Sequence, residues 1–339
     1  MSVLYHLMIP RPQTPILDAV VQEVESLRVH LGGEIVYLNP ARRPGSLYPE
    51  RLYGLHRLAY LRRREVTIQL HHIYNSHLFY FPYLRWLNRP VVYTVAAGLR
   101  TSECPAHLER LAALARIIVT NERDEAILGG WGLNNSEVAR PGIDITRLVS
   151  QPVPSGPLTL LVGSAPWTRA QFVSKGVDAL LAVARARLDL RLIFLWRGLL
   201  VDEMNRRVVA AGLSERVSVC NYHVDVNTVL EGVHASIVLA SDETLVKAFP
   251  HSLLESLAAG RPVLISRSIP MADFVAQAGC GVVVERVDPP AVLAAVNELA
   301  ARYQQYQTAT LQLDRETFSL DQVKRTYTRI YHSVVEGVV

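Results

Sequence analysis

Residues 247–266 read Lys-Ala-Phe-Pro-His-Ser-Leu-Leu-Glu-Ser-Leu-Ala-Ala-Gly-Arg-Pro-Val-Leu-Ile-Ser. This stretch predicts a tight loop, a short helix, a glycine stop and a buried strand. Proline suits the first position of a helix, so Pro250 marks the predicted start of the helix, and Gly260 lies just past its end. The apolar run Val263–Ile265 is short enough to be a strand of a parallel sheet.

The rest of the chain alternates short apolar runs with segments that have a helical spacing of apolar residues. In the first half, strands are expected at 3–9, 34–38, 66–70, 90–95 and 117–120, and helices at 16–31, 49–64, 106–115 and from 122. In the second half, strands are expected at 158–162, 190–195, 217–220, 235–239 and 281–284, and helices at 175–186, 202–211 and 226–233. Alternating strands and helices imply parallel pairing with right-handed crossovers. The sequence therefore predicts an α/β fold of two doubly wound Rossmann-like domains, with ligands at the carboxyl ends of the strands in the cleft between them.

The segment Gln151-Pro-Val-Pro-Ser-Gly-Pro157 separates the two halves and contains three prolines. We interpret it as the hinge between the domains, because such a run interrupts both helices and strands. The expected organisation is a first domain over 1–150, a second domain over 151–317 and a final helix over 318–339.

The composition is that of a globular protein. At 339 residues the chain is long for one hydrophobic core and comfortable for two. Hydrophobic residues make up 50% and charged residues 19%, which argues against disorder. The three cysteines, Cys104, Cys220 and Cys280, lie far apart without metal-ligand spacing, which favours a reducing compartment. Neither a signal peptide nor a run of ~18 apolar residues is found, so we expect a cytoplasmic protein.

Arginines gather in the first half of the chain. Residues 1–150 carry 17 Arg, no Lys and 13 acidic residues, a balance of 17 − 13 = +4. Ten of these arginines lie between Arg42 and Arg100, against only Glu50 and Glu65, and aromatic residues are interleaved with them. This pattern is typical of a surface that contacts anionic lipids at the inner face of a membrane, or that binds a phosphate-bearing acceptor. A solvated arginine face explains it equally well, and without a recognised binding motif nucleic acid is not an expected partner.

The predicted helix after Pro250 offers a site for a phosphorylated ligand. Backbone N–H groups at a helix start carry a partial positive charge, so the loop Phe249–Ser252 is a candidate anion-binding element. Lys175, placed after the strand end at Gly163, adds a cation. The chain has 32 Arg but only three Lys, at 175, 247 and 324, and two of the three fall in this predicted site. Neither Gly-x-Gly-x-x-Gly nor a phosphate-loop sequence occurs, which disfavours a dinucleotide or a simple NTP.

The 247–266 stretch resembles the nucleotide-sugar motif of the family 4, or group 1, glycosyltransferases, Glu-x-Phe-Gly/Pro-x-x-x-x-Glu-Ala-x-Ala-x-Gly-x-Pro-Val. Other landmarks similar to that family follow in the same order along nearly the whole chain: Arg89–Gly98, Ala115–Asn121, Arg140–Asp144, Leu161–Ser164 with Lys175-Gly176, and Phe318–Asp321 with Ile330-Tyr331. The 247–266 motif and the Lys-Gly pair are fairly specific, whereas the other landmarks are individually weak.

The resemblance implies a GT-B architecture, with an acceptor-side first domain, a second domain that binds the nucleotide-sugar, and a C-terminal helix that packs back onto the first domain. It implies a retaining glycosyltransferase that moves a hexosyl group from a UDP- or GDP-sugar to a hydroxyl acceptor, with no metal and no cofactor besides the donor. Such a reaction belongs to cell-surface glycan, glycolipid or polysaccharide synthesis. Lipid-linked, polysaccharide and small-molecule acceptors all stay open.

The resemblance also assigns roles to residues of this chain. The implied catalytic residues are Lys175, which stabilises the departing diphosphate, and Lys247, which lies beside the sugar. Glu255 takes the role of the carboxylate that accepts the ribose hydroxyls, although a helix-face salt bridge with Arg261 is an alternative. The implied donor-binding residues are Gly163, Ser164, Arg169, Phe249, Pro250, His251, Ser252 and Glu255.

Four features depart from the family pattern, and one of them is the glycine-rich loop after the first strand, whose place is taken by Pro10-Arg-Pro-Gln-Thr-Pro15. Lys247 replaces a carboxylate, Ser164 replaces an arginine and Ala96 replaces a histidine. Lysine cannot accept hydrogen bonds, so Lys247 suits an acidic sugar or a phosphate, or else pairs with Glu243 and leaves that acid to bind the sugar. The candidate replacements for the other two positions are Arg169 or Arg197, and His71, His72 or His77. A catalytically inactive nucleotide-binding or partner subunit, or a different sugar-nucleotide or sugar-phosphate enzyme on the same fold, therefore stays as an alternative.

Overall fold

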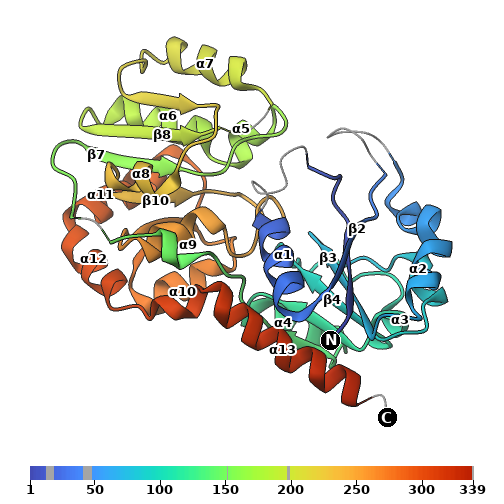
Figure 1. The fold of residues 1–339 in the computed structure, drawn as a ribbon. Coiled ribbons are helices and arrows are strands. Elements are labelled where there is room, and N and C mark those ends of the chain that lie inside the picture. Colours follow the sequence, from blue (N-terminus) through green and yellow to red (C-terminus); the bar gives the residue numbers. More distant parts are fainter. Residues whose placement is uncertain (13–18, 41–47, 151, 197–198, 338–339) are drawn as a thin grey trace. The chain divides into compact units, whose positions relative to one another are not determined.

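The computed structural model describes residues 1–12, 19–40, 48–150, 152–196 and 199–337. It divides into two compact units: unit 1 comprises Met1–Ile143 with Glu316–Val339, and unit 2 comprises Asp144–Arg315. Within the described residues, each unit is built on one six-stranded sheet whose neighbouring strands are all parallel, flanked by helices (Figure 1). The predicted α/β fold of two Rossmann-like domains is therefore confirmed.

The border between the units differs from the expected one. We placed it at the proline segment 151–157, of which residue 151 lies outside the described residues, whereas the units divide between Ile143 and Asp144. The reason is that Ile143 is tied to the end of the chain. Its N–H donates to the carbonyl of Phe318 at 2.8 Å, and its own carbonyl accepts from the N–H of Leu320 at 3.1 Å. The proline segment accordingly lies within unit 2.

Unit 1 has the strand order β2-β1-β3-β4-β5-β6. Its strands are β1 (Val3–Leu7), β2 (Gly33–Tyr37), β3 (Leu70–Asn75), β4 (Val91–Val95), β5 (Arg116–Val119) and β6 (Ser136–Val138). Its α-helices are α1 (Ala19–Leu31), α2 (Leu58–Arg64), α3 (Leu108–Ala112), α4 (Glu122–Gly130) and α13 (Leu320–Glu336). Three short 3-10 helices, η2 (Glu50–Leu52), η3 (Leu55–Arg57) and η4 (Pro82–Trp86), complete the described elements of this unit.

The core of unit 1 lies on both faces of its sheet, because side chains along a strand alternate between faces. In β1, Leu4 belongs to the cluster on one face, while Val3, Tyr5 and Leu7 belong to the cluster on the other. Helix α13 covers the second of these faces, and its buried residues recur with helical spacing along one side. These residues are Val323, Tyr327, Ile330, Tyr331 and Val334.

Two elements of unit 1 differ from the prediction. The helix expected over 49–64 is broken at Gly54, which has φ +79°, into η2, η3 and the shorter α2. A Cβ at Gly54 would lie 2.4 Å from the ring of Tyr83, so only glycine fits this approach. The strand expected at 66–70 starts instead at Leu70, because Val66 is 83% exposed and precedes the sheet. His71 and His72 consequently lie inside β3.

Unit 2 has the strand order β12-β11-β10-β7-β8-β9. Its strands are β7 (Leu158–Val162), β8 (Leu190–Leu195), β9 (Val217–Cys220), β10 (Ala235–Val238), β11 (Val263–Ser266) and β12 (Gly281–Val284). Its helices are α5 (Gln171–Ser174), α6 (Val177–Ala186), α7 (Val201–Ala210), α8 (Val226–Glu231), α9 (His251–Ala258), α10 (Met271–Ala278), α11 (Pro289–Ala301) and α12 (Tyr303–Leu311). The 3-10 helix η5 (Ile145–Arg147) lies near its start, and η6 (Arg315–Phe318) begins at its last residue and continues into unit 1.

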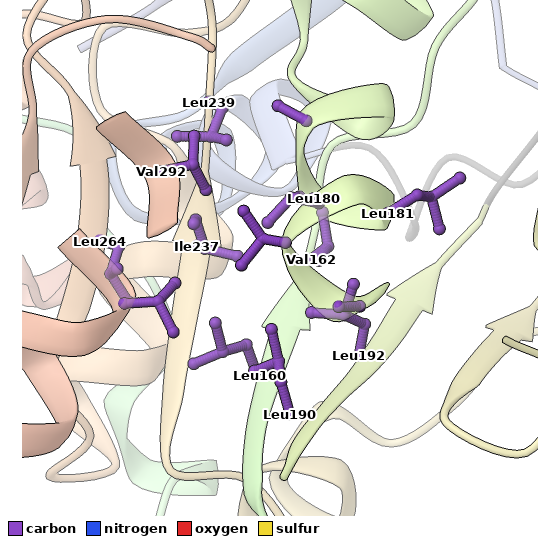
Figure 2. Close-up of a cluster of buried hydrophobic side chains, with 14 of the residues drawn as sticks. Leu160, Val162, Leu180, Leu181, Leu190, Leu192, Ile237, Leu239, Leu264 and Val292 are labelled. Carbon is purple, nitrogen blue, oxygen red and sulfur yellow. The ribbon is translucent and has the colours of Figure 1, made fainter. Parts of the chain in front are cut away.

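The core of unit 2 forms where helices pack onto the central strands. Figure 2 shows Leu160 and Val162 of β7 beside Ile237 of β10 and Leu192 of β8, with Leu180 of α6 above them. All five side chains are almost completely buried. Packing of this kind, worth about 1.5–3 kcal/mol for each large apolar side chain that leaves water, fixes the carboxyl ends of these strands in place.

The stretch that decides the fold largely takes its predicted form. Helix α9 and strand β11 both occur, and Gly260 has φ +75° just after the helix, as a glycine stop requires. Pro250 differs from the expectation, because its ψ of 122° is extended and it therefore caps the helix instead of occupying its first position. The helix begins at His251.

Candidate active site

The carboxyl ends of β7 and β10 mark the switch point of the sheet in unit 2. The chain builds β7, β8 and β9 outward in one direction, and then returns to place β10 on the other side of β7. Open α/β sheets bind ligands outside the carboxyl ends of their strands at such a point. Three of the predicted site segments, the loop from Gly163, the Lys175-Gly176 pair and the start of α9, lie around these strand ends.

Gly163 and Ser252 bring two of those segments together. Gly163 directly follows β7, and a Cβ added to it would lie 2.5 Å from both Cβ and Oγ of Ser252. Real Cβ atoms do not approach other atoms so closely, so the absence of a side chain at Gly163 is what permits the contact. The first turn of α9 therefore lies directly against the loop that leaves β7.

The start of α9 presents backbone donors at this point. The first N–H groups of a helix have no acceptor within the helix, and within the described residues no side chain caps α9. Pro250 uses its carbonyl to accept from the N–H groups of Leu253 and Leu254, at 3.0 and 3.2 Å. Phe249 and Pro250 are buried, whereas His251 and Ser252 are only partly buried. The loop can thus offer N–H groups and the partial positive charge of the helix end to an anion.

Lys175 is a buried cation on the other side of the same loop. Its side chain is only 6% exposed, and its Nζ donates to the carbonyl of Ala165 at 3.1 Å. In the described part of the chain no carboxylate forms an ion pair with it. Burial lowers the pKa of this lysine to about 8, because the charged form loses its hydration.

The glycine after Lys175 fixes where that lysine sits. Gly176 has φ +67°, and a Cβ on it would lie 2.6 Å from Cδ1 of Leu239, the residue after β10. The N–H of Ser241, further along the same loop, donates to the carbonyl of Ser174 at 2.7 Å. Both contacts pin the turn between α5 and α6 against the end of β10, so that Lys175 reaches the loop after β7.

These contacts define what the arrangement can do chemically. The short loop of residues 163–165 touches Ser252 at one end and Lys175 at the other. An ammonium group has three N–H donors, and a single carbonyl satisfies only one of them. A buried charge without an opposite charge is costly, and an anionic ligand at this loop would remove that cost. The site is therefore suited to a phosphate or diphosphate group.

Lys247 lies next to His251. The pKa of His251 is held well below its usual range, first by burial and second by the positive charge of Lys247. Lys247 and Glu255 are both partly buried. Lys247 lies before α9, and Glu255 lies in its second turn. The alternative pairing of Glu255 with Arg261 is not formed, since Arg261 is fully buried and donates to the carbonyls of Leu230 and Pro152, at 3.2 and 2.7 Å.

The remaining predicted site residues have different environments. Ser164 follows Gly163 and is partly buried, whereas Arg169 is exposed just before α5. Arg197, the other candidate for the missing phosphate cation, lies outside the described residues. Glu243, considered as a partner of Lys247, is partly buried in the loop after β10.

The three histidines considered as replacements at Ala96 divide into two groups. His71 and His72 are fully buried inside the sheet of unit 1. His71 Nε2 lies 3.2 Å from Oε1 of Glu65, and His72 Nε2 lies 2.8 Å from Oγ1 of Thr94. They are hydrogen-bonded core residues and cannot meet a ligand, so their proposed role as replacements is wrong. His77 is exposed and pairs with Glu50, a contact that the sequence analysis did not foresee.

Two other kinds of feature, a metal site and a membrane-spanning helix, are absent from the described residues. Among the described residues, no group of three or more His, Cys, Asp and Glu side chains is arranged to hold a metal ion. In the same residues, none of the helices combines the length and the apolar character that crossing a membrane demands.

One family model matches a part of unit 2. Residues 169–309, which make up less than half of the chain and lie within unit 2, match the model of the family described as glycosyl transferases group 1. This segment includes Arg169, Lys175, Lys247 and Glu255, and leaves Gly163 and Ser164 outside. No functionally curated protein matches the chain by sequence.

Solved structures share the whole fold. The chain is similar to HepE of Anabaena in complex with UDP and glucose, with a TM-score of 0.70, 14% identity, and coverage of 98% of this chain and 100% of that one. It is similar to sucrose-phosphate synthase of Thermosynechococcus elongatus, with a TM-score of 0.72, 14% identity, and coverage of 99% and 100%. A glycosyltransferase of Rickettsia africae gives a TM-score of 0.71, 13% identity, and coverage of 98% of both chains.

At these identities the solved structures establish only the fold. The family model additionally matches the sequence of unit 2 around Lys175 and α9. The two findings agree with the resemblance carried by residues 247–266. Residues 169–309 are thus similar to the group 1 glycosyl transferases, and the chain as a whole has the GT-B fold of two Rossmann-like domains.

Proposed function

We propose that the protein is a retaining glycosyltransferase that moves a hexosyl group from a UDP-sugar to a hydroxyl acceptor. The observation that carries this proposal is Lys175, a buried ammonium without a carboxylate partner in the described chain, beside a loop that also meets the start of α9. UDP is favoured over GDP because HepE, a structural neighbour over the full chain, is known in complexes with UDP and with UDP-glucose.

The proposed reaction breaks the bond between C1 of the donor sugar and the oxygen of the β-phosphate. The acceptor oxygen forms the new bond to C1 on the same face, and its proton leaves with the diphosphate. Negative charge grows on the β-phosphate as the sugar departs. Lys175 and the backbone N–H groups at the start of α9 would stabilise that charge, which is the electrostatic form of catalysis that usually contributes most.

The other donor-site residues take supporting roles in the proposal. Gly163 lets the start of α9 approach the loop after β7, and Ser164 donates a hydrogen bond to a phosphate oxygen. Glu255 accepts hydrogen bonds from the two ribose hydroxyls. Lys247, adjacent to His251, would meet the sugar itself, and its charge suits a donor sugar that carries an acidic group.

The arginines of unit 1 support a proposal for the acceptor and for where the protein acts. Several arginines of the segment 48–100 are exposed, while others pair with acids, such as Arg64 with Glu34 at 2.7 Å. Exposed apolar side chains accompany them, among them Leu52 and Val66. This combination favours contact of unit 1 with an anionic membrane surface and hence a lipid-linked acceptor in glycolipid or cell-surface glycan synthesis.

The test is a turnover assay with purified protein and a panel of UDP- and GDP-sugars, neutral and acidic, with release of the nucleoside diphosphate as the readout. We expect UDP release from at least one donor and its near abolition in Lys175→Met. NMR of the product should show the anomeric configuration of the donor. A protein that binds UDP but turns over none of the donors would instead be an inactive nucleotide-binding subunit, the alternative that Lys247, Ser164 and Ala96 suggest.

A further inference from the structure

A second polar cluster lies at the carboxyl edge of the sheet in unit 1. The strand order β2-β1-β3 places β1 between the two strands that follow it in the chain, so the carboxyl ends of β1 and β3 form the switch point of this sheet. Doubly wound sheets bind ligands at such points. Strand β3 ends at Asn75, and His77 follows two residues later, at this edge.

His77 and Glu50 form a hydrogen-bonded pair at this position. Nε2 of His77 lies 3.0 Å from Oε2 of Glu50. Asn75 donates through Nδ2 to Oε1 of the same carboxylate at 3.3 Å and to the carbonyl of His77 at 2.9 Å. The hydroxyl of Tyr93 donates to that carbonyl as well, at 3.0 Å. Asn75 at the end of β3 and Tyr93 of β4 therefore hold the pair at this edge of the sheet.

The pair nevertheless remains open to solvent. The side chain of His77 is 49% exposed and that of Glu50 is 29% exposed. A carboxylate has about four acceptor positions, and the contacts from Asn75 and His77 occupy two of them. An ordinary surface ion pair would be free to move, whereas here the core residue Asn75 holds the carboxylate of Glu50, and Asn75 and Tyr93 hold the backbone carbonyl of His77.

The stacked rings of Tyr48, Tyr53 and Phe81 lie beside the carboxylate of Glu50. The rings of Tyr48 and Tyr53 are stacked with centroids 6.1 Å apart, and those of Tyr53 and Phe81 are stacked with centroids 6.3 Å apart. Tyr48, at the open end, is 37% exposed. Burial and then the charge of Glu50 raise the pKa of Tyr53, which places the carboxylate close to this row.

We propose that Tyr48, Glu50 and His77 form the binding site for a saccharide acceptor. A pyranose offers an apolar face of C–H groups that packs against an aromatic ring, and hydroxyls that donate to a carboxylate. His77, whose Nδ1 lies 3.1 Å from Oγ of Ser76 and whose Nε2 lies 3.0 Å from Oε2 of Glu50, orients that carboxylate. The negative charge of Glu50 repels phosphate, so the group bound here is the sugar part of an acceptor. The inference rests on the proposed glycosyl transfer, because it assigns the chemical class of the acceptor.

Saturation-transfer difference NMR of the full chain tests the site without requiring turnover. The probes are the methyl glycosides of glucose, galactose, mannose and N-acetylglucosamine, with glycerol phosphate as the anionic comparison. We expect at least one glycoside to bind and glycerol phosphate not to bind. Glu50→Gln should weaken glycoside binding about tenfold or more, as the loss of a hydrogen bond to a charged group does. Tyr48→Ala should also weaken it about tenfold, because it removes the ring against which the sugar packs.

Matched variants separate this site from the donor site and from misfolding. Glu103→Gln removes an exposed carboxylate of unit 1 that pairs with Arg100, and should leave glycoside binding unchanged. The rise in melting temperature on adding UDP should persist in Glu50→Gln, which shows a folded protein with an intact donor site. The inference is overturned if none of the glycosides binds, or if one binds equally well to Tyr48→Ala and Glu50→Gln. If UDP does not bind but a glycoside does, the proposed transfer fails while the saccharide site stands.

Discussion

Gly163 and Ser252, which belong to a strand end and a helix start far apart in the sequence, lie so close that a Cβ on the glycine would be 2.5 Å from the Cβ of the serine. The contact joins the loop after β7 to the first turn of α9. The same loop accepts a hydrogen bond from Lys175 through the carbonyl of Ala165. Two sources of positive potential, an ammonium and a helix end, are thereby held at one short loop.

The close approach of Gly163 and Ser252 can be tested by adding a side chain to the glycine. Gly163→Ala should push α9 away from the loop, weaken UDP binding about tenfold or more and cost roughly 1–3 kcal/mol of unfolding free energy, the usual range for overpacking. Gly232→Ala in the same unit is the matched control, because its Cβ would have one ordinary contact, at 3.8 Å. Calorimetric titration with UDP and denaturant unfolding measure the two effects. Equal UDP affinity in both variants would show that the contact plays no part in binding.

Lys175 predicts a pH dependence of nucleotide binding. Burial lowers its pKa to about 8 in the free protein, and a bound diphosphate should raise that pKa because it favours the charged form. UDP affinity should then be constant well below pH 8 and fall as the pH rises through 8. The dissociation constant measured between pH 6.5 and 9.5 checks this. Lys175→Met should bind weakly with a flat profile, whereas Lys324→Met, which removes a partly exposed lysine paired with Asp321, should match the parent protein.

The same group predicts the opposite trend for the stability of the free protein. The folded-state pKa of Lys175 is depressed, so between about pH 8 and the ordinary lysine pKa the unfolded chain binds more protons than the folded one. The contribution of Lys175 to the unfolding free energy therefore rises with pH in this range. The unfolding free energy of the parent protein minus that of Lys175→Met, measured from pH 7.5 to 10, should therefore rise with pH. A constant difference would mean that the lysine is not desolvated.

Lys247 should affect the choice of donor more than the fold. Lys247→Glu restores the carboxylate that the family motif carries and reverses the charge next to His251. We expect a shift of preference from acidic towards neutral donor sugars, with little change in melting temperature. Competition between paired UDP-sugars in the turnover assay measures it. An unchanged donor profile would show that the side chain points away from the sugar.

The buried contact between His72 and Tyr331 predicts how α13 is held. The hydroxyl of Tyr331 lies 2.5 Å from Nδ1 of His72, and both side chains are fully buried. Tyr331→Phe should cost about 1–3 kcal/mol of unfolding free energy, since it leaves a buried ring nitrogen without its partner. Tyr222→Phe, at a tyrosine that is 67% exposed, should cost almost nothing. Equal unfolding free energies for the two variants would contradict this account of the helix.

His72 also sets the acid side of the stability profile. Burial holds its pKa well below the ordinary value of 6.5, so below that pH the unfolded chain takes up a proton that the folded chain does not. Unfolding free energy should therefore fall as the pH drops from about 7 to 5. His72→Gln should have a lower stability at pH 7 and a shallower slope over this range. A slope equal to that of the parent protein would assign the acid sensitivity to other groups.

The fold could be predicted because its signals are local. Strands such as β7 and β8 are short apolar runs whose residues alone fix their bounds, and Gly260 ends α9 through its own backbone freedom. The prediction erred where a distant residue decides. The ring of Tyr83 requires glycine at position 54 and so breaks the helix that the spacing favoured.

The candidate donor site could be predicted in outline because it rests on a motif. Its detailed contacts could not, because they join residues that the sequence keeps apart. Nothing near Lys175 reveals that it reaches Ala165 instead of a carboxylate, and nothing near Arg261 reveals that two backbone carbonyls hold it. The pair of Glu50 and His77 was missed for the same reason, since only the switch point of the sheet brings them together.

Titration of UDP into the purified protein and into Lys175→Met at pH 7 tests the central claim most directly. The account predicts that UDP binds the parent protein and that the variant, still folded, binds it at least about tenfold more weakly, as expected when a charge-assisted contact to phosphate is lost. A parent protein that binds neither UDP nor GDP, or a variant that binds UDP as well as the parent does, would contradict it.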